Sequence, residues 1–572
     1  MMMTYLTSIT QLWRKHPTFF LLMLVMAVAV LPGVTQLPPM DRDEARYMQA
    51  SHQMLDSGDV ITIRFQDELR AKKPAGIYWL QSASAAVFGG DKPGSYRLPS
   101  ILAGFGVAFM TLIFASRMMS QTQALLAATL IGISLVMVTE SRLAKTDAVL
   151  TFLIMVQQFA LWRIIHLHRN DRYVSGGWAL MLWTALAFAI LVKGPIAPAI
   201  LLLTGLGFMI LERRMNWALA TRPLLGLIVV TLIVLPWVLL VTAATDGAFL
   251  ETAIKGDFLN KLESGQESHG MPFGTHLLLL LIVLWPGSLL LGRSISGIWA
   301  HRKTPSTRFL LAWILPFWFM IEITPTKLPH YSLPVLPAIA LLMACFGWQA
   351  KAPVLHFPTV SGDGKSPKVL SLILGVLKPS TGVILLEYLC LLIGPLLGGT
   401  IFVIASLYDG PMLLASLVLG LGIATAVVGW LWRRPGGKPS YLAAMLILGA
   451  LFHAVTLGGV LPRMDGLHLA PRIKAELHRL DVLDKPIASA GYHEPSLVFA
   501  LGEDVLLFSA EQTALFMVEA PDGTALVEAA SAPEFLDILG QMQITVTAVG
   551  VIEGFNYSRG DPARIGIYRR LQ

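Results

Sequence analysis

Long apolar stretches recur along almost the whole chain, and they constrain its fold more than any other feature. The chain has 572 residues, of which 55% are hydrophobic and 14% are charged. A helix that crosses a bilayer needs about 20 predominantly apolar residues, and about thirteen stretches come close to this length. They cover residues 18–36, 98–116, 122–139, 147–164, 176–192, 195–211, 223–243, 275–292, 309–323, 332–350, 380–407, 411–432 and 440–461. The sequence therefore predicts a polytopic α-helical membrane protein.

The first apolar stretch has two interpretations. Arg14 and Lys15 precede it, as basic residues precede both signal peptides and signal anchors. No A-x-A-like cleavage site follows, and many further spans come after it. We expect this stretch to be retained as the first span.

Basic residues are distributed unevenly between the two sides that these spans define. With a cytoplasmic N-terminus, the inside loops collect most of the lysines and arginines, as the positive-inside rule requires. The C-terminus is then outside. The first outside loop, residues 37–97, is the exception, because it is rich in lysine and arginine although it lies outside. This surplus of positive charge suggests an anionic ligand on the outer face. The basic residues of this loop are Arg42, Arg46, Arg64, Arg70, Lys72, Lys73, Lys92 and Arg97.

The net charge of +7 fits a protein at a membrane surface that contacts anionic membrane lipids. It does not indicate nucleic acid, because the basic residues are spread over many loops and not gathered on one soluble face.

The chain divides into two parts. Residues 1–462 form the predicted transmembrane domain, and residues 463–572 are much more polar. Short β-branched or apolar runs at 486–490, 504–508 and 544–549 predict strands, and residues 532–542 have a helical pattern. We expect a small α/β domain on the outer face, because about 110 residues can bury a core.

A charge cluster stands near the start of the first outside loop, where residues 41–47 read DRDEARY. Asp41 and Glu44 have the spacing of a capping box, and the helical pattern that follows ends at Gly58. Asp43, Arg46 and Tyr47 should share one face of this helix. A carboxylate in the first turn is also stabilised by the helix dipole without any catalytic role, so a structural interpretation stays open.

Two lysines, Lys72 and Lys73, immediately precede an apolar aromatic segment, residues 74–81, that should lie in the membrane interface. Such cations could hold a lipid phosphate. The alternative is that they only reach anionic headgroups of the surrounding bilayer.

With these motifs, the chain resembles the membrane glycosyltransferases that include the aminoarabinose transferases of lipid A and, more distantly, the protein O-mannosyltransferases. The matching segments are D-E-x-R-Y at residues 43–47, the K-P before Y-W-L-Q within 73–81, and K-L-P-x-Y-x-L-P at 327–334. The resemblance implies a GT-C fold with outer-face loops and a C-terminal α/β domain. It also implies transfer of a sugar from a polyprenyl (undecaprenyl) phosphate carrier to an acceptor at the periplasmic face of the bacterial inner membrane.

The resemblance also implies roles for individual residues. Asp43 matches the acidic residue that is treated as catalytic, and Asp147 matches a second acidic position. Arg46, Lys73 and Tyr331 match positions that bind the carrier phosphate. The remaining candidate substrate contacts are Glu44, Lys327 and His269.

The chemistry is compatible with these roles. Cleaving a sugar from a phosphate releases an anion, which Arg46, Lys73 and Lys327 could stabilise. Asp43 could remove the proton of an acceptor hydroxyl during direct displacement, which inverts the anomeric carbon. If the acceptor is a phosphate monoester, as in lipid A, Asp43 would mainly orient it.

A bound metal is possible but not favoured. The position before the K-P lysine is acidic in some relatives, where it could join a histidine as a metal ligand, but here it is Lys72. His269 is then a substrate contact or a loop hydrogen-bonder. Cys345 and Cys390 lie in predicted spans without metal-ligand spacing, and we expect them to be packing residues. No cofactor is required by the sequence.

The acceptor is left open between lipid A or another lipopolysaccharide part, an envelope glycan and a protein. A lipid or solute transporter is the alternative from another class. It is less favoured, because a transporter should place its charges near the midplane on interrupted helices, whereas here they lie at the outer loops.

Overall fold

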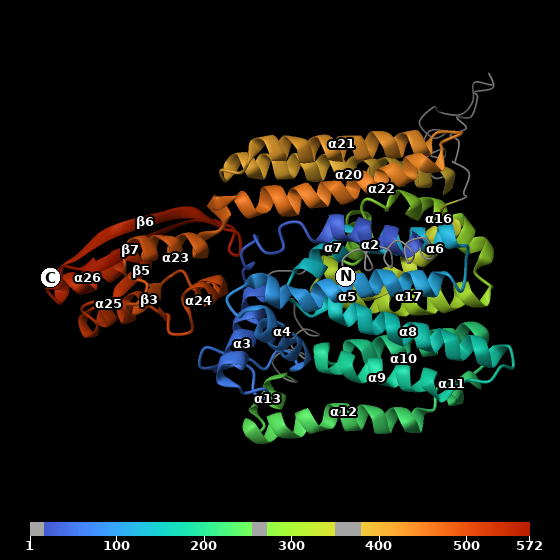
Figure 1. Cartoon of the computed structure of the whole chain (residues 1–572), viewed down its shortest axis with the longest axis horizontal. Helices are drawn as coiled ribbons and strands as arrows, with labels where there is room; N and C mark the ends of the chain where they lie inside the picture. Colours follow the sequence, from blue (N-terminus) through green and yellow to red (C-terminus); the bar gives the residue numbers. More distant parts are fainter. Residues whose placement is uncertain (1–16, 254–270, 349–378, 572) are drawn as a thin grey trace, which may run out of the picture.

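The computed structural model describes residues 17–253, 271–348 and 379–571. Figure 1 shows a bundle of long helices with a sheet domain at one end. The sheet domain is built from the C-terminal residues, and the first outside loop lies between it and the helices. The predicted class, a helical membrane domain followed by an α/β domain, is confirmed.

Nine helical segments in the described part of the chain are long and apolar enough to cross a membrane. They are α5 (Pro93–Ala115), α8 (Asp147–Arg169), α9 (Gly176–Lys193), α12 (Pro223–Ala244), α17 (Pro305–Ile323), η2 with α18 (Pro329–Phe346), most of α20 (Pro379–Leu407), α21 (Met412–Arg433) and α22 with the turns that follow it (Pro439–Arg463).

The other four predicted stretches are shorter or broken, so the count of thirteen spans is not confirmed. α2 (Pro17–Val30) and α10 (Ile196–Glu212) are shorter apolar helices, while α6 (Gln121–Gly132) and α7 (Leu135–Arg142) form one pair bent by 58°. The bend has a local cause: Ser134 is extended, and the N–H of Leu135 donates to the carbonyl of Trp285 at 2.9 Å. The stretch at 275–292 divides into α15 (Thr275–Val283) and α16 (Leu289–His301) around Pro286, which has no N–H to donate.

Local sequence signals explain several helix starts. Ser120 and Gln123 form a capping box at α6, and the Ser175 side chain accepts a bond from Gly177 N–H at α9. Proline occupies the first turn of α5, α17 and α22, where its missing N–H has no intrahelical acceptor anyway.

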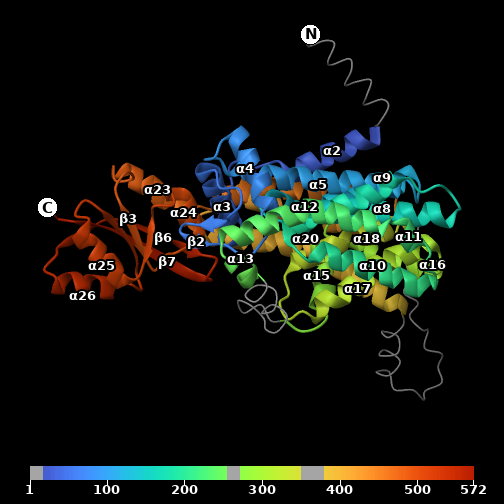
Figure 2. The same cartoon turned by 90° about the horizontal axis from the view of Figure 1, so that it is seen from below.

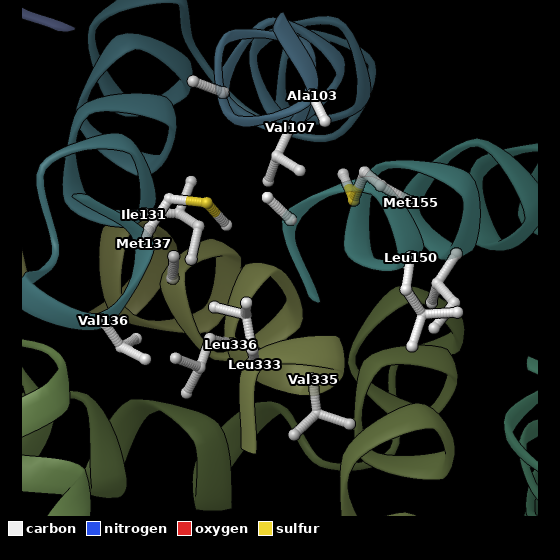
Figure 3. Packing of buried hydrophobic residues seen from close by; sticks show 14 of the residues in the cluster. Ala103, Val107, Ile131, Val136, Met137, Leu150, Met155, Leu333, Val335 and Leu336 are labelled. Atoms are coloured by element: carbon white, nitrogen blue, oxygen red, sulfur yellow. The ribbon is translucent and has the colours of Figure 1, made fainter. Parts of the chain in front are cut away.

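The bundle is held together by one large apolar core. Figure 3 shows its packing, with Val107 of α5, Ile131 of α6, Met137 of α7, Met155 of α8 and Leu333 of η2 directed toward one another. Each of these side chains is fully buried or nearly so.

Helices α20, α21 and α22 lie side by side along one flank, and α12 lies along the opposite one (Figure 1). α20 and α21 approach closely at Gly394 and Gly422, where a Cβ on Gly422 would clash with the backbone of Gly394.

The C-terminal domain is a five-stranded mixed sheet in the order β4-β3-β5-β7-β6. β3 (Ile487–Ala490) pairs in parallel with β4 (Leu506–Phe508) and β5 (Thr524–Glu528), while β7 (Asp561–Arg570) is antiparallel to β5 and to β6 (Val546–Asn556). Its helices are α23 (Leu469–Arg479), α24 (Pro495–Leu501), α25 (Ala510–Glu519) and α26 (Ala532–Gln541). The predicted strands and the predicted helix are all present, whereas β5 and β7 were not anticipated.

The first outside loop forms α3 (Asp43–Ser57), the two-stranded hairpin of β1 (Arg64–Phe65) and β2 (Glu68–Leu69), and α4 (Gly76–Phe88). Gly58 ends α3 with φ of 70°, a left-handed conformation that glycine adopts without strain, as predicted. The loop lies at the same end of the bundle as the C-terminal domain (Figure 2).

Candidate functional site

The start of α3 differs from the predicted capping box. Asp41 does not cap the helix, since its Oδ1 accepts from the N–H of Ser496 in the C-terminal domain at 2.8 Å. Glu44 does reach back, but to the N–H of Met40 at 2.8 Å. The residue before the helix is Arg42 with φ of 65°, which is strained for a residue with a Cβ. A contact with a distant domain has therefore replaced the local cap.

Glu44 is buried in an ion pair that organises the loop. Arg97 donates to both of its carboxylate oxygens at 2.9 Å, and the N–H of Ala144 donates to Oε1 at 2.9 Å. Arg97 also donates to the carbonyls of Val34, Leu37 and Pro38. The described partners of the Glu44 carboxylate are Arg97 and the N–H groups of Met40 and Ala144, and direct substrate contact by Glu44 stays a prediction.

Asp43, Arg46 and Tyr47 of α3 have surroundings that differ from those of Glu44. The Asp43 side chain is exposed, Arg46 is partly exposed, and the Tyr47 ring is buried beside that of Tyr78, with ring centres 5.4 Å apart. Burial raises the pKa of Tyr47 well above its usual value, and the charges of Asp43 and Asp147 act in the same direction. Asp43 and Asp147 therefore both lie near this tyrosine.

Arg70 is a member of this group that the sequence did not single out. Its Nε donates to the hydroxyl of Tyr78 at 3.0 Å, and its guanidinium lies over the ring of Tyr47, 5.2 Å from the ring centre. The only sequence signal for it was the surplus of basic residues in the first loop.

A second charged cluster surrounds Asp147 at the start of α8. Lys193, at the end of α9, donates to its Oδ1 at 2.6 Å. Lys145 donates to Glu140 at 3.1 Å, and His330 Nδ1 lies 3.8 Å from the same carboxylate. Burial opposes the charge of Lys145, but Glu140, Asp147 and Asp43 outweigh it and raise its pKa. The two predicted acids, Asp43 and Asp147, are thus brought into one electrostatic neighbourhood.

The K-L-P-x-Y segment contributes Lys327 and Tyr331. Lys327 is buried, and its ammonium donates to the carbonyls of Ile321, Glu322 and Thr324 at the end of α17. The Tyr331 ring stacks on His276 and meets His330 edge-on, with centres 6.5 and 5.1 Å apart. Tyr331 is therefore next to the second charged cluster, whereas the Lys327 ammonium bonds a helix end.

The lysine pair of the first loop lies between the hairpin and α4. Lys72 is exposed, while Lys73 is partly exposed and donates to the carbonyl of Lys72 at 2.8 Å. His269 lies outside the described residues. Within the ranges that the structure describes, no three His, Cys, Asp or Glu side chains gather as a possible metal site.

The C-terminal domain contacts the charged cluster directly. The N–H of Asp41 donates to the Tyr557 hydroxyl at 2.7 Å, and Arg42 donates to the carbonyl of Ser558 at 2.5 Å. Burial raises the pKa of Asp41 to about 6, with a further contribution from Glu494 and against the bonds from Ser496 and the charge of Arg46.

Two further contacts fix the domain against the loop. The Phe499 ring meets those of His52 and Tyr96 edge-on, 6.3 and 5.8 Å between centres. The side-chain amide of Gln66, at the hairpin turn, donates to the carbonyls of Glu503 and Val505. The domain thus contacts both α3 and the hairpin that precedes Arg70.

Comparisons with known proteins agree with this architecture. Residues 18–246 match the dolichyl-phosphate-mannose-protein mannosyltransferase family. The chain is 28% identical over 303 residues to the undecaprenyl phosphate-α-4-amino-4-deoxy-L-arabinose arabinosyl transferase 1 of Pseudomonas fluorescens (strain Pf0-1), covering 53% of this chain and 52% of that protein. It is 28% identical over 332 residues to the corresponding transferase of Pseudomonas paraeruginosa (strain DSM 24068 / PA7), covering 58% and 59%. The matches span little more than half the length of these relatives.

Solved structures with the same fold include the crystal structure of ArnT from Cupriavidus metallidurans bound to undecaprenyl phosphate. The TM-score is 0.70 at 17% identity, covering 96% of this chain and 97% of that one. The Archaeoglobus fulgidus oligosaccharyltransferase is more distant, with a TM-score of 0.52 at 10% identity, covering 90% and 69%. The predicted resemblance is confirmed, and the chain has the fold of the ArnT structure.

Proposed function

We propose that this chain, which contains a segment of the mannosyltransferase family and has the ArnT fold, is an integral membrane glycosyltransferase. It moves a sugar from undecaprenyl phosphate to a lipid A- or lipopolysaccharide-type acceptor. The observation that carries this proposal is that the family match, residues 18–246, contains Asp43, Arg46, Lys73 and Asp147. Relatives named as transferases that use an undecaprenyl phosphate sugar support the donor class.

The reaction is a single displacement with inversion. An acceptor oxygen bonds to the anomeric carbon of the sugar while the bond from that carbon to the carrier phosphate breaks. Asp43 accepts the proton of an acceptor hydroxyl, or orients an acceptor phosphate that has no proton to lose. Arg46 and Lys73, together with the Tyr331 hydroxyl, stabilise the undecaprenyl phosphate that leaves.

Asp147 contacts the sugar in this proposal. Lys193 donates to its carboxylate, which holds the Asp147 side chain in position at the start of α8. Glu44 and Lys327 remain candidate substrate contacts. Their bonds to Arg97 and to the end of α17 also support roles in positioning α3 and the K-L-P-x-Y segment. His269 remains a candidate substrate contact from the outer loop.

The proposed location is the bacterial inner membrane, with the N-terminus in the cytoplasm and the C-terminal domain in the periplasm. The shared position of the first loop and the C-terminal domain at one end of the bundle supports this orientation (Figure 1). The uneven distribution of lysine and arginine between the loops supports it independently.

The test is transfer by the purified full-length protein in detergent, with labelled undecaprenyl phosphate-linked sugars as donors and purified lipid A, envelope glycans and envelope proteins as separate acceptors. We expect label on lipid A and release of undecaprenyl phosphate. If only protein or only another glycan becomes labelled, that molecule and not lipid A is the acceptor. Movement of lipid or solute in vesicles without any sugar transfer would contradict the proposal and favour a transporter.

A further inference from the structure

Arg70 is partly buried, and its partners differ from those of the buried arginines of this protein. Arg97 pairs with Glu44, and Arg293 pairs with Glu387 at 2.6 Å. Arg142 donates to backbone carbonyls of Val30 and Leu457. Arg70 donates through Nε to the Tyr78 hydroxyl. Among the residues that the structure describes, no carboxylate lies within salt-bridge distance of its guanidinium, and no group accepts a hydrogen bond from its two terminal nitrogens.

The Arg70 side chain is nevertheless held in place. The Tyr78 hydroxyl accepts from Nε, and the face of Tyr47 lies beneath the guanidinium plane. Both tyrosines are buried, so this support is rigid. An arginine that is fixed through Nε and through an aromatic face presents its other N–H groups as a preorganised fork.

The backbone of Arg70 is fixed as well. Its N–H donates to the carbonyl of Ile63 at 2.8 Å, which extends the β1–β2 hairpin by one rung. The hairpin turn at Gln66 is bonded to Gln53 of α3 on one side and to the C-terminal domain on the other. The fork therefore keeps its position relative to α3 when no ligand is present.

The two terminal nitrogens of the fork carry N–H donors and positive charge, so an anion is the ligand that they can hold. Asp43 is close enough to act electrostatically on Arg70 and on Tyr78, which places the fork near the proposed transfer site. A guanidinium binds phosphate oxygens through two parallel N–H bonds, with a geometry that lysine cannot supply. We propose that the Arg70 fork binds a phosphate group of one of the two substrates in the transfer site, and that it does so by bidentate bonds from its terminal nitrogens.

This inference rests on the proposed function, which brings two possible phosphates to the site. One is the phosphate of the polyprenyl carrier, and the other is a phosphate monoester on a lipid acceptor. Both offer the same oxygens to the fork, so the contact chemistry is shared. The two cases can be distinguished, because a change of Arg70 weakens binding of the carrier in the first case and of the acceptor in the second.

The experiment compares Arg70→Met and Arg70→Lys with Arg64→Met in the full-length protein. Arg64 is the matched control, because it is an exposed arginine of the same hairpin that donates to the carbonyl of Asp67. Binding of undecaprenyl phosphate is measured directly, and transfer is measured with the donor and the acceptor titrated separately. Loss of a charge-assisted bond should weaken the affected substrate roughly tenfold to a hundredfold.

The two supporting results identify the phosphate. Weaker binding of undecaprenyl phosphate to Arg70→Met assigns the fork to the carrier. Unchanged carrier binding with a higher half-saturating acceptor concentration assigns it to the acceptor. In either case Arg70→Lys should recover only part of the loss, because it restores the charge without the fork.

The inference is overturned if Arg70→Met behaves like Arg64→Met in all three titrations. If Arg70→Met does not fold, Tyr78→Phe provides the second variant, since it removes the acceptor of Nε and keeps the ring. Tyr78→Phe should weaken binding of the same substrate by a smaller factor. Unchanged binding of both substrates to Tyr78→Phe would also overturn the inference. A wild-type protein that binds undecaprenyl phosphate but transfers no sugar would contradict the proposed function and leave the binding comparison interpretable.

Discussion

Asp43 and Glu44 are neighbours in the first turn of α3, yet their carboxylates have opposite surroundings. Glu44 is 2% exposed and accepts bonds from Arg97, Met40 and Ala144. Asp43 is exposed near Tyr47 and Arg70, and no residue of the described part of the chain forms a hydrogen bond with its carboxylate. A carboxylate whose oxygens are all bonded to the protein has little capacity left for a ligand, whereas the exposed one can bond a substrate. The difference separates a residue that builds the site from one that can act in it.

The lysines of the two matching motifs show the same division. The Lys327 ammonium donates to three carbonyls at the end of α17 and is 3% exposed. Lys73 lies at the partly exposed edge of the first loop. Membership of a motif therefore does not distinguish substrate contact from support.

The largest effect should come from Asp43. Asp43→Asn should lower the rate of transfer to a hydroxyl acceptor roughly a hundredfold or more, as expected for loss of a general base, and lower it less with a phosphate acceptor, which Asp43 only orients. The melting temperature should stay that of the wild type. Initial rates at saturating donor test the effect on transfer, and thermal unfolding in detergent tests the effect on stability. Transfer at the wild-type rate would remove Asp43 from the mechanism.

Changing Glu44, the neighbour of Asp43, should mainly lower the stability of the protein. Glu44→Gln leaves the buried Arg97 charge without a counter-ion, which costs about 3–5 kcal/mol when one partner of a buried pair is removed. We expect a much lower melting temperature and a lower yield of folded protein. Asp43→Asn is the matched control in the same turn. Equal stability of the two variants would abolish the distinction between the two carboxylates.

A smaller effect is expected at Lys327. Lys327→Met leaves the last carbonyls of α17 without a donor, which should destabilise the protein by about 1–3 kcal/mol. Undecaprenyl phosphate binding should be retained at low temperature, whereas Lys73→Met should weaken it. Carrier binding that falls with Lys327→Met while stability is unchanged would instead favour the phosphate contact implied by the family resemblance.

The smallest effect concerns Asp41 and depends on pH. Its pKa is raised to about 6 in the folded protein from an ordinary value of 3.8. The folded state holds this proton more tightly, so the associated stability is present below about pH 4 and is lost as pH rises through about 6. The charged and titratable groups around Asp41 are Glu494, Arg46, Tyr492 and Tyr557.

Asp41→Asn can still accept the bond from Ser496 but cannot ionise. Its melting temperature should match the wild type near about pH 4 and exceed it slightly at about pH 8. Thermal unfolding across this range gives the measurement. A constant difference between the two proteins at every pH would mean that Asp41 does not titrate in the folded state.

The sequence predicted the parts of the site that depend on local pattern. The helix from Asp43 to Gly58 and most of the apolar spans follow from spacing that is visible in the chain, whereas the acid of the D-E-x-R-Y motif was singled out by the family resemblance. Contacts between distant segments were not visible. The pairing of Glu44 with Arg97, the use of Lys327 at a helix end and the support of Arg70 by Tyr78 each depend on packing that brings separate segments together.

The broken spans were missed for the same reason. Hydropathy reports that a stretch is apolar, but the bend between α6 and α7 depends on a bond from Leu135 to Trp285, far along the chain. Likewise, the D-x-x-E spacing at residues 41–44 predicted a local cap, and Ser496 of the C-terminal domain took the place of the expected N–H donor.

The bond from Asp41 to Tyr557 joins residues 516 positions apart, and it lies immediately before the helix that begins with Asp43. A ribosome that has already delivered every membrane span has not yet made Tyr557. The N-terminal end of α3 therefore receives this partner among the last events of synthesis. Nascent chains inserted in the membrane would lack the finished arrangement until their final residues emerge, which delays maturation of the site to the end of translation.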